Sequence, residues 1–268
     1  MVLENTKAYK KPSTVDTTST LLKTPKKYVI DKNITKYTVK DIEDVAYKMY
    51  SKGLASGSIK NLLGAIKRAF DIGIKLGIIG FNPVFNIKIP TRKIRSKCVY
   101  TKEQIKILLD NSCGELRTYL YVAIYTGARP GEILALTKED IQGDYISISK
   151  TLINGTKTLQ TPKNGCSRLV FIPECLRQEL KDFKAFTIKY TTLLYKFKKL
   201  CMSLEVPYSG LHSLRHSYAS ILLNNKVNPM IIKEALGHKD LSMINTVYGH
   251  FLGYREQDKE AIKSSLDF

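Results

Sequence analysis

Apolar residues recur at the three- and four-residue spacing of a helix along most of this chain, and they alternate only between residues 144 and 173. Helical spacing runs from Val39 to about Ser51 and again from Ile59 to about Leu76. The alternating stretch contains DYISISKT, TKTLQT and SRLVFIP, with Asn-Gly pairs that are typical of hairpin turns. The sequence therefore predicts a mainly α protein with one small, three-stranded antiparallel β-sheet.

Signals at helix ends support this pattern. Thr38 with Asp41, and Thr101 with Gln104, have the spacing of a capping box. A serine of the segment ASGS is expected to cap the helix that carries Ile59. Later in the chain, LRTYLYVAIYT is predicted to be a helix that ends at the following glycine, and ILALTKEDI is predicted to be the next one. Behind the sheet, helices are expected over residues 174–183, 190–204, 212–224, 229–237 and 241–248.

Breaks in the pattern divide the chain into segments. Residues 1–12 are loose and basic, and residues 13–86 are predicted to form a small helical domain. Residues 87–98 read as a basic linker, for which an ordinary solvated loop is the alternative. Residues 99–268 are expected to form a larger helix-rich domain that contains the sheet.

The formal net charge of +19 favours a polyanionic partner. No run of 18 apolar residues and no strongly amphipathic basic helix is present, so nucleic acid is favoured over a membrane. An excess of charge that only maintains solubility is the alternative. The five cysteines are scattered without a Cys-x-x-Cys pair, which argues against disulfides and structural zinc. With no secretory signal at the N-terminus, we expect a cytoplasmic, nucleoid-associated protein.

One tyrosine near the C-terminal end lies among basic residues that suit phosphate chemistry. Tyr248 follows His238 by ten residues, and His212 lies three residues before Arg215, on the same face of a helix. Arg129 lies far upstream, in YTGARPGEILAL. A tyrosine hydroxyl attacks a phosphodiester when cations and hydrogen-bond donors stabilise the charge on the phosphate oxygens. The set therefore predicts reversible covalent cutting of DNA.

Other residues complete this chemistry or compete with it. Lys163 stands on a predicted hairpin turn, where an ammonium group can protonate a leaving oxygen, and Lys157 is the alternative. Glu132 lies one turn after Arg129 and is placed to hold a basic partner. Tyr254 is the alternative nucleophile.

A zinc site is the competing interpretation of the histidines. His212 and His216 have the i, i+4 spacing of two ligands, but no HExxH glutamate and no third ligand accompany them. We therefore expect no metal, and we expect His216 to be a packed core or capping histidine. Each of the other residues also has an alternative without a function. Arg129 could be a surface arginine, His238 could interact with the dipole at a helix end, and Tyr248 could be a half-buried aromatic residue.

Taken together, four stretches resemble the tyrosine recombinases of the phage integrase and Xer-like family: YTGARPGEILALTKEDI, TPKNGCSRLVFIP, HSLRHSYASILL and LGHKDLSMINTVYGH. They cover most of residues 99–250. The helical region that ends in GFNPVFNIKIP resembles, with weaker matching, the core-binding (SAM-like) domain of that family.

The resemblance implies a role for each residue of the set. Arg129, His212 and Arg215 would bind the scissile phosphate. Tyr248 would be the nucleophile, and Lys163 the general acid.

Two further roles follow from the same resemblance. His238 takes the place that histidine or tryptophan fills in relatives, and Glu132 is the supporting carboxylate. The interval from His238 to Tyr248 is ten residues, where many relatives have nine, and the hairpin loop after Lys163 is slightly long.

The resemblance also implies an activity and its partners. The family cuts and rejoins specific DNA sites through a 3′-phosphotyrosyl intermediate in a tetramer. Because this intermediate keeps the energy of the broken phosphodiester, no cofactor is expected. The terminal segment FLGYREQDKEAIKSSLDF is expected to form an amphipathic helix that docks on a neighbouring subunit, and packing on its own domain is the alternative. Integration or excision of a mobile element and resolution of chromosome or plasmid dimers are both open, as are accessory DNA-bending and directionality proteins.

The helical domain and the linker are expected to close around double-stranded DNA as a clamp. The basic residues expected to contact DNA are Lys60, Lys67, Arg68, Arg92, Lys93, Arg95 and Lys97. Two other functions compete with the recombinase: a type IB-like topoisomerase that relaxes a single duplex, and a DNA-binding regulator without enzymatic activity.

Overall fold

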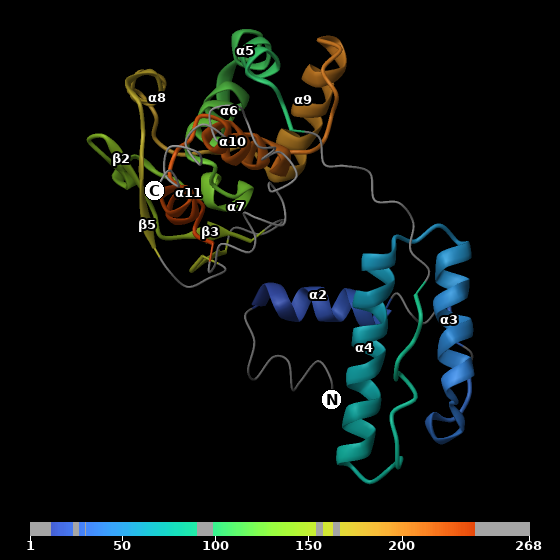
Figure 1. Ribbon diagram of the computed structural model, residues 1–268. Helices are drawn as coiled ribbons and strands as arrows, with labels where there is room; N and C mark the ends of the chain where they lie inside the picture. Colours follow the sequence, from blue (N-terminus) through green and yellow to red (C-terminus); the bar gives the residue numbers. More distant parts are fainter. Residues whose placement is uncertain are drawn as a thin grey trace, which may run out of the picture. The chain divides into compact units, whose positions relative to one another are not determined.

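The computed structural model describes residues 12–23, 27–29, 31–89, 99–153, 158–162 and 167–238. These residues are mainly helical with small antiparallel sheets, which confirms the predicted fold class at that level (Figure 1). The chain divides into two compact units, residues 1–95 and 96–268, and each unit has a hydrophobic core of its own. The finer boundaries predicted near residues 12, 86 and 98 stay predictions. None of the helices in these ranges is both long and apolar enough to span a membrane.

The N-terminal unit is built from helices. Its elements are α2 (Pro12–Lys23), the 3-10 turn η2 (Ile34–Lys36), α3 (Val39–Ser51) and α4 (Ser56–Lys75). Thr38 and Asp41 form the predicted capping box at the start of α3. The apolar faces of α3 and α4 pack together, with Ile42 and Ile59 fully buried.

The start of α4 differs from the prediction. Ala55 is the N-cap and makes no side-chain cap, while Ser56 and Ser58 lie inside the first turn. The predicted serine cap was therefore wrong. Burial of the apolar face that begins at Ile59 stabilises this end of the helix, and packing of that kind dominates over propensity in most proteins.

The larger unit combines helices with short strands (Figure 1). The helices are α5 (Lys102–Asp110), α6 (Gly114–Thr126), α7 (Pro130–Ile133), α8 (Glu174–Glu179), α9 (Tyr190–Ser203), α10 (His212–Asn224) and α11 (Pro229–Leu236), with the 3-10 turn η3 (Lys138–Asp140). The fully buried α6 residues Tyr119 and Leu120 belong to its core, and α6 packs against α10 (Figure 1). The predicted capping box of Thr101 and Gln104 opens α5. The helix predicted over residues 241–248 lies outside the described residues.

The segment ILALTKEDI is not the helix that its position predicted. Only one helical turn, α7, forms there, and the chain then leaves the helix at Leu134. All residues from Ile133 to Leu136 are buried, so this stretch has no polar face and crosses the core instead of lying along its surface. Thr137 and Asp140 then start a separate 3-10 turn.

The strands form two sheets where one was predicted. They are β1 (Ile141–Gln142), β2 (Tyr145–Ile148), β3 (Thr151–Leu152), β4 (Leu159–Gln160) and β5 (Arg168–Phe171). The three-stranded sheet has the order β1-β2-β5, and in the described ranges β4 pairs with β3 in a second, two-stranded sheet. The prediction missed β1 because the turn at Gly143, with φ of +58°, was not recognised. The Asn-Gly pairs at 154–155 and 164–165 lie outside the described residues.

Candidate active site

Arg129 is positioned by a sharp turn between two helices. Gly127 ends α6 in the left-handed conformation, with φ of +62°. A Cβ atom at this glycine would lie 2.4 Å from Cδ1 of Tyr218, so the turn requires glycine for its backbone and for the space. Arg129 is then the N-cap of α7, and Pro130 is its first residue.

Glu132 holds Arg129 from inside the protein. The Glu132 carboxylate is 1% exposed and accepts two hydrogen bonds of 2.9 Å from Arg129, one from the backbone N–H and one from Nη1. Arg129 keeps 23% of its side chain exposed, so an anion in solvent can reach it. The basic partner predicted for Glu132 is therefore present.

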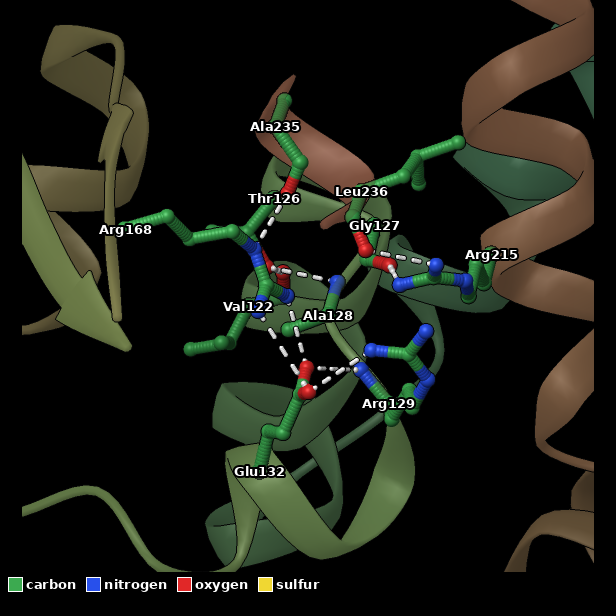
Figure 2. A network of polar contacts seen from close by, with 10 residues as sticks. All are labelled: Val122, Thr126, Gly127, Ala128, Arg129, Glu132, Arg168, Arg215, Ala235 and Leu236. Carbon is green, nitrogen blue, oxygen red and sulfur yellow. Dashed lines mark hydrogen bonds and ion pairs between the residues drawn. The ribbon is translucent and has the colours of Figure 1, made fainter. Parts of the chain in front are cut away.

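A second arginine, Arg168, meets the same carboxylate (Figure 2). Its Nη2 donates to Oε2 of Glu132 at 2.6 Å, and its Nε donates to the carbonyl oxygen of Ala235 at 2.7 Å. Arg168 is not among the residues that were predicted from the sequence. The signal was its place in the alternation of SRLVFIP, on the same side as buried Val170, because an arginine facing a core needs a buried partner.

Burial and neighbouring charges together set the protonation of two groups here. Burial by itself raises the pKa of Glu132, but the hydrogen bonds and charges of Arg168 and Arg129 outweigh it and lower the pKa below 4.5. Glu132 is therefore ionised at neutral pH. Burial raises the pKa of Tyr218 above 10.0, although the charges of Arg168 and Arg215 oppose that rise. Tyr218 is consequently a neutral phenol beside the turn at Gly127.

Arg215 joins two helix ends. It lies on α10, the helix that was predicted to begin at His212, and it is 3% exposed. Its Nη1 donates to the carbonyl oxygen of Gly127 at 2.8 Å, and its Nη2 donates to that of Leu236 at 2.7 Å (Figure 2). Arg215 therefore fixes the end of α11 against the turn that carries Arg129.

The three histidines of the motif have different surroundings. His212 is the exposed first residue of α10, and the buried His216 stands edge-on to it with ring centroids 5.0 Å apart. The expectation that His216 is a packed histidine is confirmed. His238 follows Gly237, which ends α11 with φ of +61°, and the His238 N–H donates to the carbonyl oxygen of Lys233 at 3.1 Å.

The described residues thus bring Arg129, Glu132 and Arg215 into one network with the turn that leads to His238. Lys60, Lys67 and Arg68 are exposed on α4 in the other unit, with the spacing of one helix face. The remaining predicted residues lie outside the described ranges: Arg92, Lys93, Arg95, Lys97, Lys157, Lys163, Tyr248 and Tyr254.

Known proteins share this chain's sequence pattern. The model of the phage integrase family matches residues 99–252. The ICEBs1 integrase of Bacillus subtilis is 26% identical over 275 residues, which cover 87% of this chain and 74% of the relative. The tyrosine recombinase XerA of Saccharolobus solfataricus is 28% identical over 254 residues, which cover 88% of this chain and 82% of the relative.

Solved structures share the fold. The Tn1549 transposon integrase in complex with a circular intermediate DNA superposes with a TM-score of 0.81 at 18% identity, over 99% of this chain and 98% of that one. A lambda integrase tetramer bound to a Holliday junction gives a TM-score of 0.76 at 18% identity, over 91% of this chain and 74% of that one. At this identity, the likeness establishes the fold alone.

Proposed function

The chain belongs to the phage integrase family and is a tyrosine-type site-specific DNA recombinase, and we propose that it cleaves DNA through a 3′-phosphotyrosyl bond to Tyr248. The observation that carries this proposal is the buried bridge of Arg215 between the carbonyl oxygens of Gly127 and Leu236. That bridge ties the turn of Arg129 to the helix end that precedes His238, as a shared phosphate site requires.

The basic residues bind the scissile phosphate. Arg129 and Arg215, with His212 at the exposed start of α10, contact the non-bridging oxygens and stabilise the charge that develops on them. His238 donates to the same phosphate from the end of α11. Support for this assignment comes from the rigid backbone attachment of Arg215 and from the carboxylate of Glu132, which hold the donors before DNA arrives.

The reaction exchanges one phosphodiester for another. The phenol oxygen of Tyr248 attacks the phosphorus in line, the bond from phosphorus to the 5′-oxygen breaks, and Lys163 gives a proton to the departing oxygen. The energy of the broken bond is retained in the phosphotyrosyl link, so the 5′-hydroxyl of a partner strand reverses the step without ATP. Two such rounds exchange both strands of two DNA sites through a four-way junction.

The partners follow from the same proposal. The N-terminal unit acts as the core-binding (SAM-like) domain and, with the basic segment after it, closes on duplex DNA in the nucleoid of the cytoplasm. The exposed Lys60, Lys67 and Arg68 on α4 support a phosphate-binding face. Four copies assemble on two sites by exchanging their C-terminal segments, and accessory DNA-bending or directionality proteins act with them.

Trapping the covalent intermediate tests the mechanism. A pool of nicked duplexes, from which the cleaved strand end diffuses away, is incubated with the protein, denatured in detergent and sequenced at the captured junctions. We expect the wild type to give a detergent-resistant adduct on a defined site and Tyr248→Phe to give none.

Each outcome separates the competing functions. A wild type that binds the pool but never forms an adduct would be a DNA-binding regulator. An adduct that persists in Tyr248→Phe excludes this nucleophile and directs the test to Tyr254. Relaxation of a supercoiled plasmid that lacks the captured site would identify a topoisomerase. Junctions at the ends of a mobile element, or at one chromosomal site, distinguish integration from dimer resolution.

A further inference from the structure

Arg168 has no place in the set of residues that the sequence identified, and we propose that it is a positioning residue for phosphate binding by Arg129. The inference rests on the proposed function and adds a residue to it. Arg168 is the first residue of β5, and its side chain, 9% exposed, lies between α7 and the end of α11 (Figure 2). Its guanidinium touches both of the segments that lead to the phosphate-binding residues.

The first contact is a fork on Glu132. Nη2 of Arg168 lies 2.6 Å from Oε2, and Nη1 lies 3.4 Å from Oε1. Arg129 bonds the same two oxygens, through its backbone N–H to Oε2 and through Nη1 to Oε1. The carboxylate plane is therefore fixed from one side by Arg168, and this orientation sets where the guanidinium of Arg129 points.

The fork of Arg168 on Glu132 also sets the net charge of the site. Two guanidinium groups share one buried carboxylate, so the three side chains together carry a single positive charge. Arg129 paired with Glu132 alone would be neutral and would attract a phosphate only as a dipole. Arg168 compensates Glu132 from the buried side, which leaves the charge of the more exposed Arg129 available to an anion.

The second contact of Arg168 is with the end of α11. Arg168 binds the carbonyl oxygen of Ala235, and Arg215 binds that of Leu236, so two arginines hold consecutive carbonyl groups where the helix dipole is negative. A Cβ atom at Gly237 would lie 3.0 Å from Nη1 of Arg168, so the guanidinium packs directly against this turn. His238 is the next residue, and Arg168 therefore fixes its starting point as well.

These contacts explain why the position needs arginine. A lysine ammonium group is a single point charge and cannot bond both oxygens of Glu132 and the carbonyl oxygen of Ala235 with fixed geometry. Arg168→Lys should keep the charge and lose the orientation, whereas Arg168→Met should lose both. Arg117 is a matched control, because it also joins a carboxylate, Glu179, to a backbone carbonyl oxygen.

The test is single-turnover cleavage of the nicked duplex captured above, at saturating protein, with the Kd for that duplex and the melting temperature measured in parallel. We expect Arg168→Met to cleave about 100-fold more slowly and Arg168→Lys about tenfold more slowly. The Kd of each should stay within about threefold of the wild type, since many other phosphate contacts supply the affinity. Arg117→Met and Arg117→Lys should cleave at the wild-type rate well below their melting temperatures.

A double-mutant cycle tests whether Arg168 acts through Glu132. In the Glu132→Gln background, Arg168→Met should slow cleavage by less than about threefold further, because the oriented carboxylate is already gone. Multiplicative losses would overturn the proposal, as would Arg168 variants that cleave at the rate of the Arg117 controls. If Arg168→Met does not fold, Arg168→Lys carries the test, and a wild-type rate for it overturns the proposal.

The cleavage assay distinguishes a failure of the proposed function from a failure of the role of Arg168. A wild type that forms no adduct overturns the proposed function, and this inference with it. A wild type that cleaves, together with unaffected Arg168 variants, overturns the role of Arg168 alone.

Discussion

At the scale of single residues, the site depends on a buried carboxylate that remains charged. Removing Glu132 from water is unfavourable for its ionised form, and two arginines compensate for this cost. If the carboxylate were absent, Arg168, whose side chain is 9% exposed, would lose its counter-charge. Glu132 therefore contributes to stability as well as to the orientation of Arg129.

Glu132→Gln should destabilise the larger unit in a pH-dependent way. The folded protein lowers the pKa of Glu132 below the 4.5 of an unperturbed glutamate, so the unfolded chain takes up the proton first as the pH falls. The stability that the ionised carboxylate supplies is complete above pH 4.5 and is lost as the pH falls through the lower folded value. At pH 7 we expect the variant to lose about 3–5 kcal/mol of unfolding free energy.

Urea unfolding of both proteins between pH 7 and about pH 3 measures this difference across the range in which carboxylates titrate. The difference in unfolding free energy between the wild type and Glu132→Gln should become smaller as the pH falls. Glu234→Gln, at an exposed position of α11, is the control and should stay close to the wild type throughout. A gap of constant size at every pH would contradict the ion pairing.

At the scale of elements, the turn between α6 and α7 controls the site. Gly127 adopts the left-handed conformation, contacts the ring of Tyr218 and offers its carbonyl oxygen to Arg215. Gly114, at the start of α6, also has a positive φ of +56° but has open space around it. The two glycines therefore separate the cost of backbone conformation from the cost of a steric clash.

Gly114→Ala should lose about 1–2 kcal/mol of unfolding free energy, because only the left-handed backbone disfavours the new side chain. Gly127→Ala should lose about 1–3 kcal/mol more, because its Cβ must also displace Tyr218. Chemical denaturation gives both values, and cleavage of the captured site should fall only in Gly127→Ala, whose shifted turn moves the partner of Arg215. Equal losses in the two variants would show that the contact with Tyr218 is unimportant.

Strand β5 shows how one element serves two faces. Arg168 and Val170 point to the interior, whereas Leu169 and Phe171 are each 59% exposed. These two residues line an apolar groove with a volume of about 820 Å³, together with residues that include Ile105, Tyr121, Ile221 and Ile231. A surface of this kind would suit the apolar residues of the C-terminal segment that we propose is exchanged between subunits.

At the scale of the whole molecule, assembly should depend on that groove. The double variant Leu169→Ser with Phe171→Ser should form tetramers on paired sites about tenfold less well, while cleavage of an isolated site is retained. Native mass spectrometry or analytical ultracentrifugation of the DNA complexes measures assembly. Tyr195→Ser with Met202→Ser, on the exposed surface of α9, is the control pair and should assemble like the wild type. Unimpaired assembly of the groove variant would place the exchange elsewhere.

The division into two units predicts how affinity is distributed. Residues 1–100 contain 20 Lys and Arg against 7 Asp and Glu, and the larger unit has a core of its own. A fragment of residues 96–268 should therefore fold but bind the captured site more weakly. The plot of the logarithm of the binding constant against the logarithm of the salt concentration has a negative slope. The magnitude of that slope should decrease by about 0.9 for each phosphate contact that is lost. Titrations at several salt concentrations test this, and an unchanged slope would contradict the DNA clamp.

Local spacing was sufficient for much of this protein. The helices α3 and α5 were predictable because their apolar faces and their capping boxes are encoded within a few neighbouring positions. Arg129, Glu132 and Arg215, which the fold links through the turns at Gly127 and Gly237, were likewise identified from their motifs, whereas the roles of Lys163 and Tyr248 stay predictions.

Tertiary structure decided the rest. Arg168 meets a carboxylate 36 positions earlier, and Arg215 meets a carbonyl oxygen 88 positions earlier, so no local pattern identifies either partner. The extent of α7 and the division of the strands into two sheets also depended on what lies buried around them. The sequence by itself determined which groups are available for phosphate chemistry, and only the fold decided which of them are charged, held and aimed, because those properties arise between segments far apart in the chain.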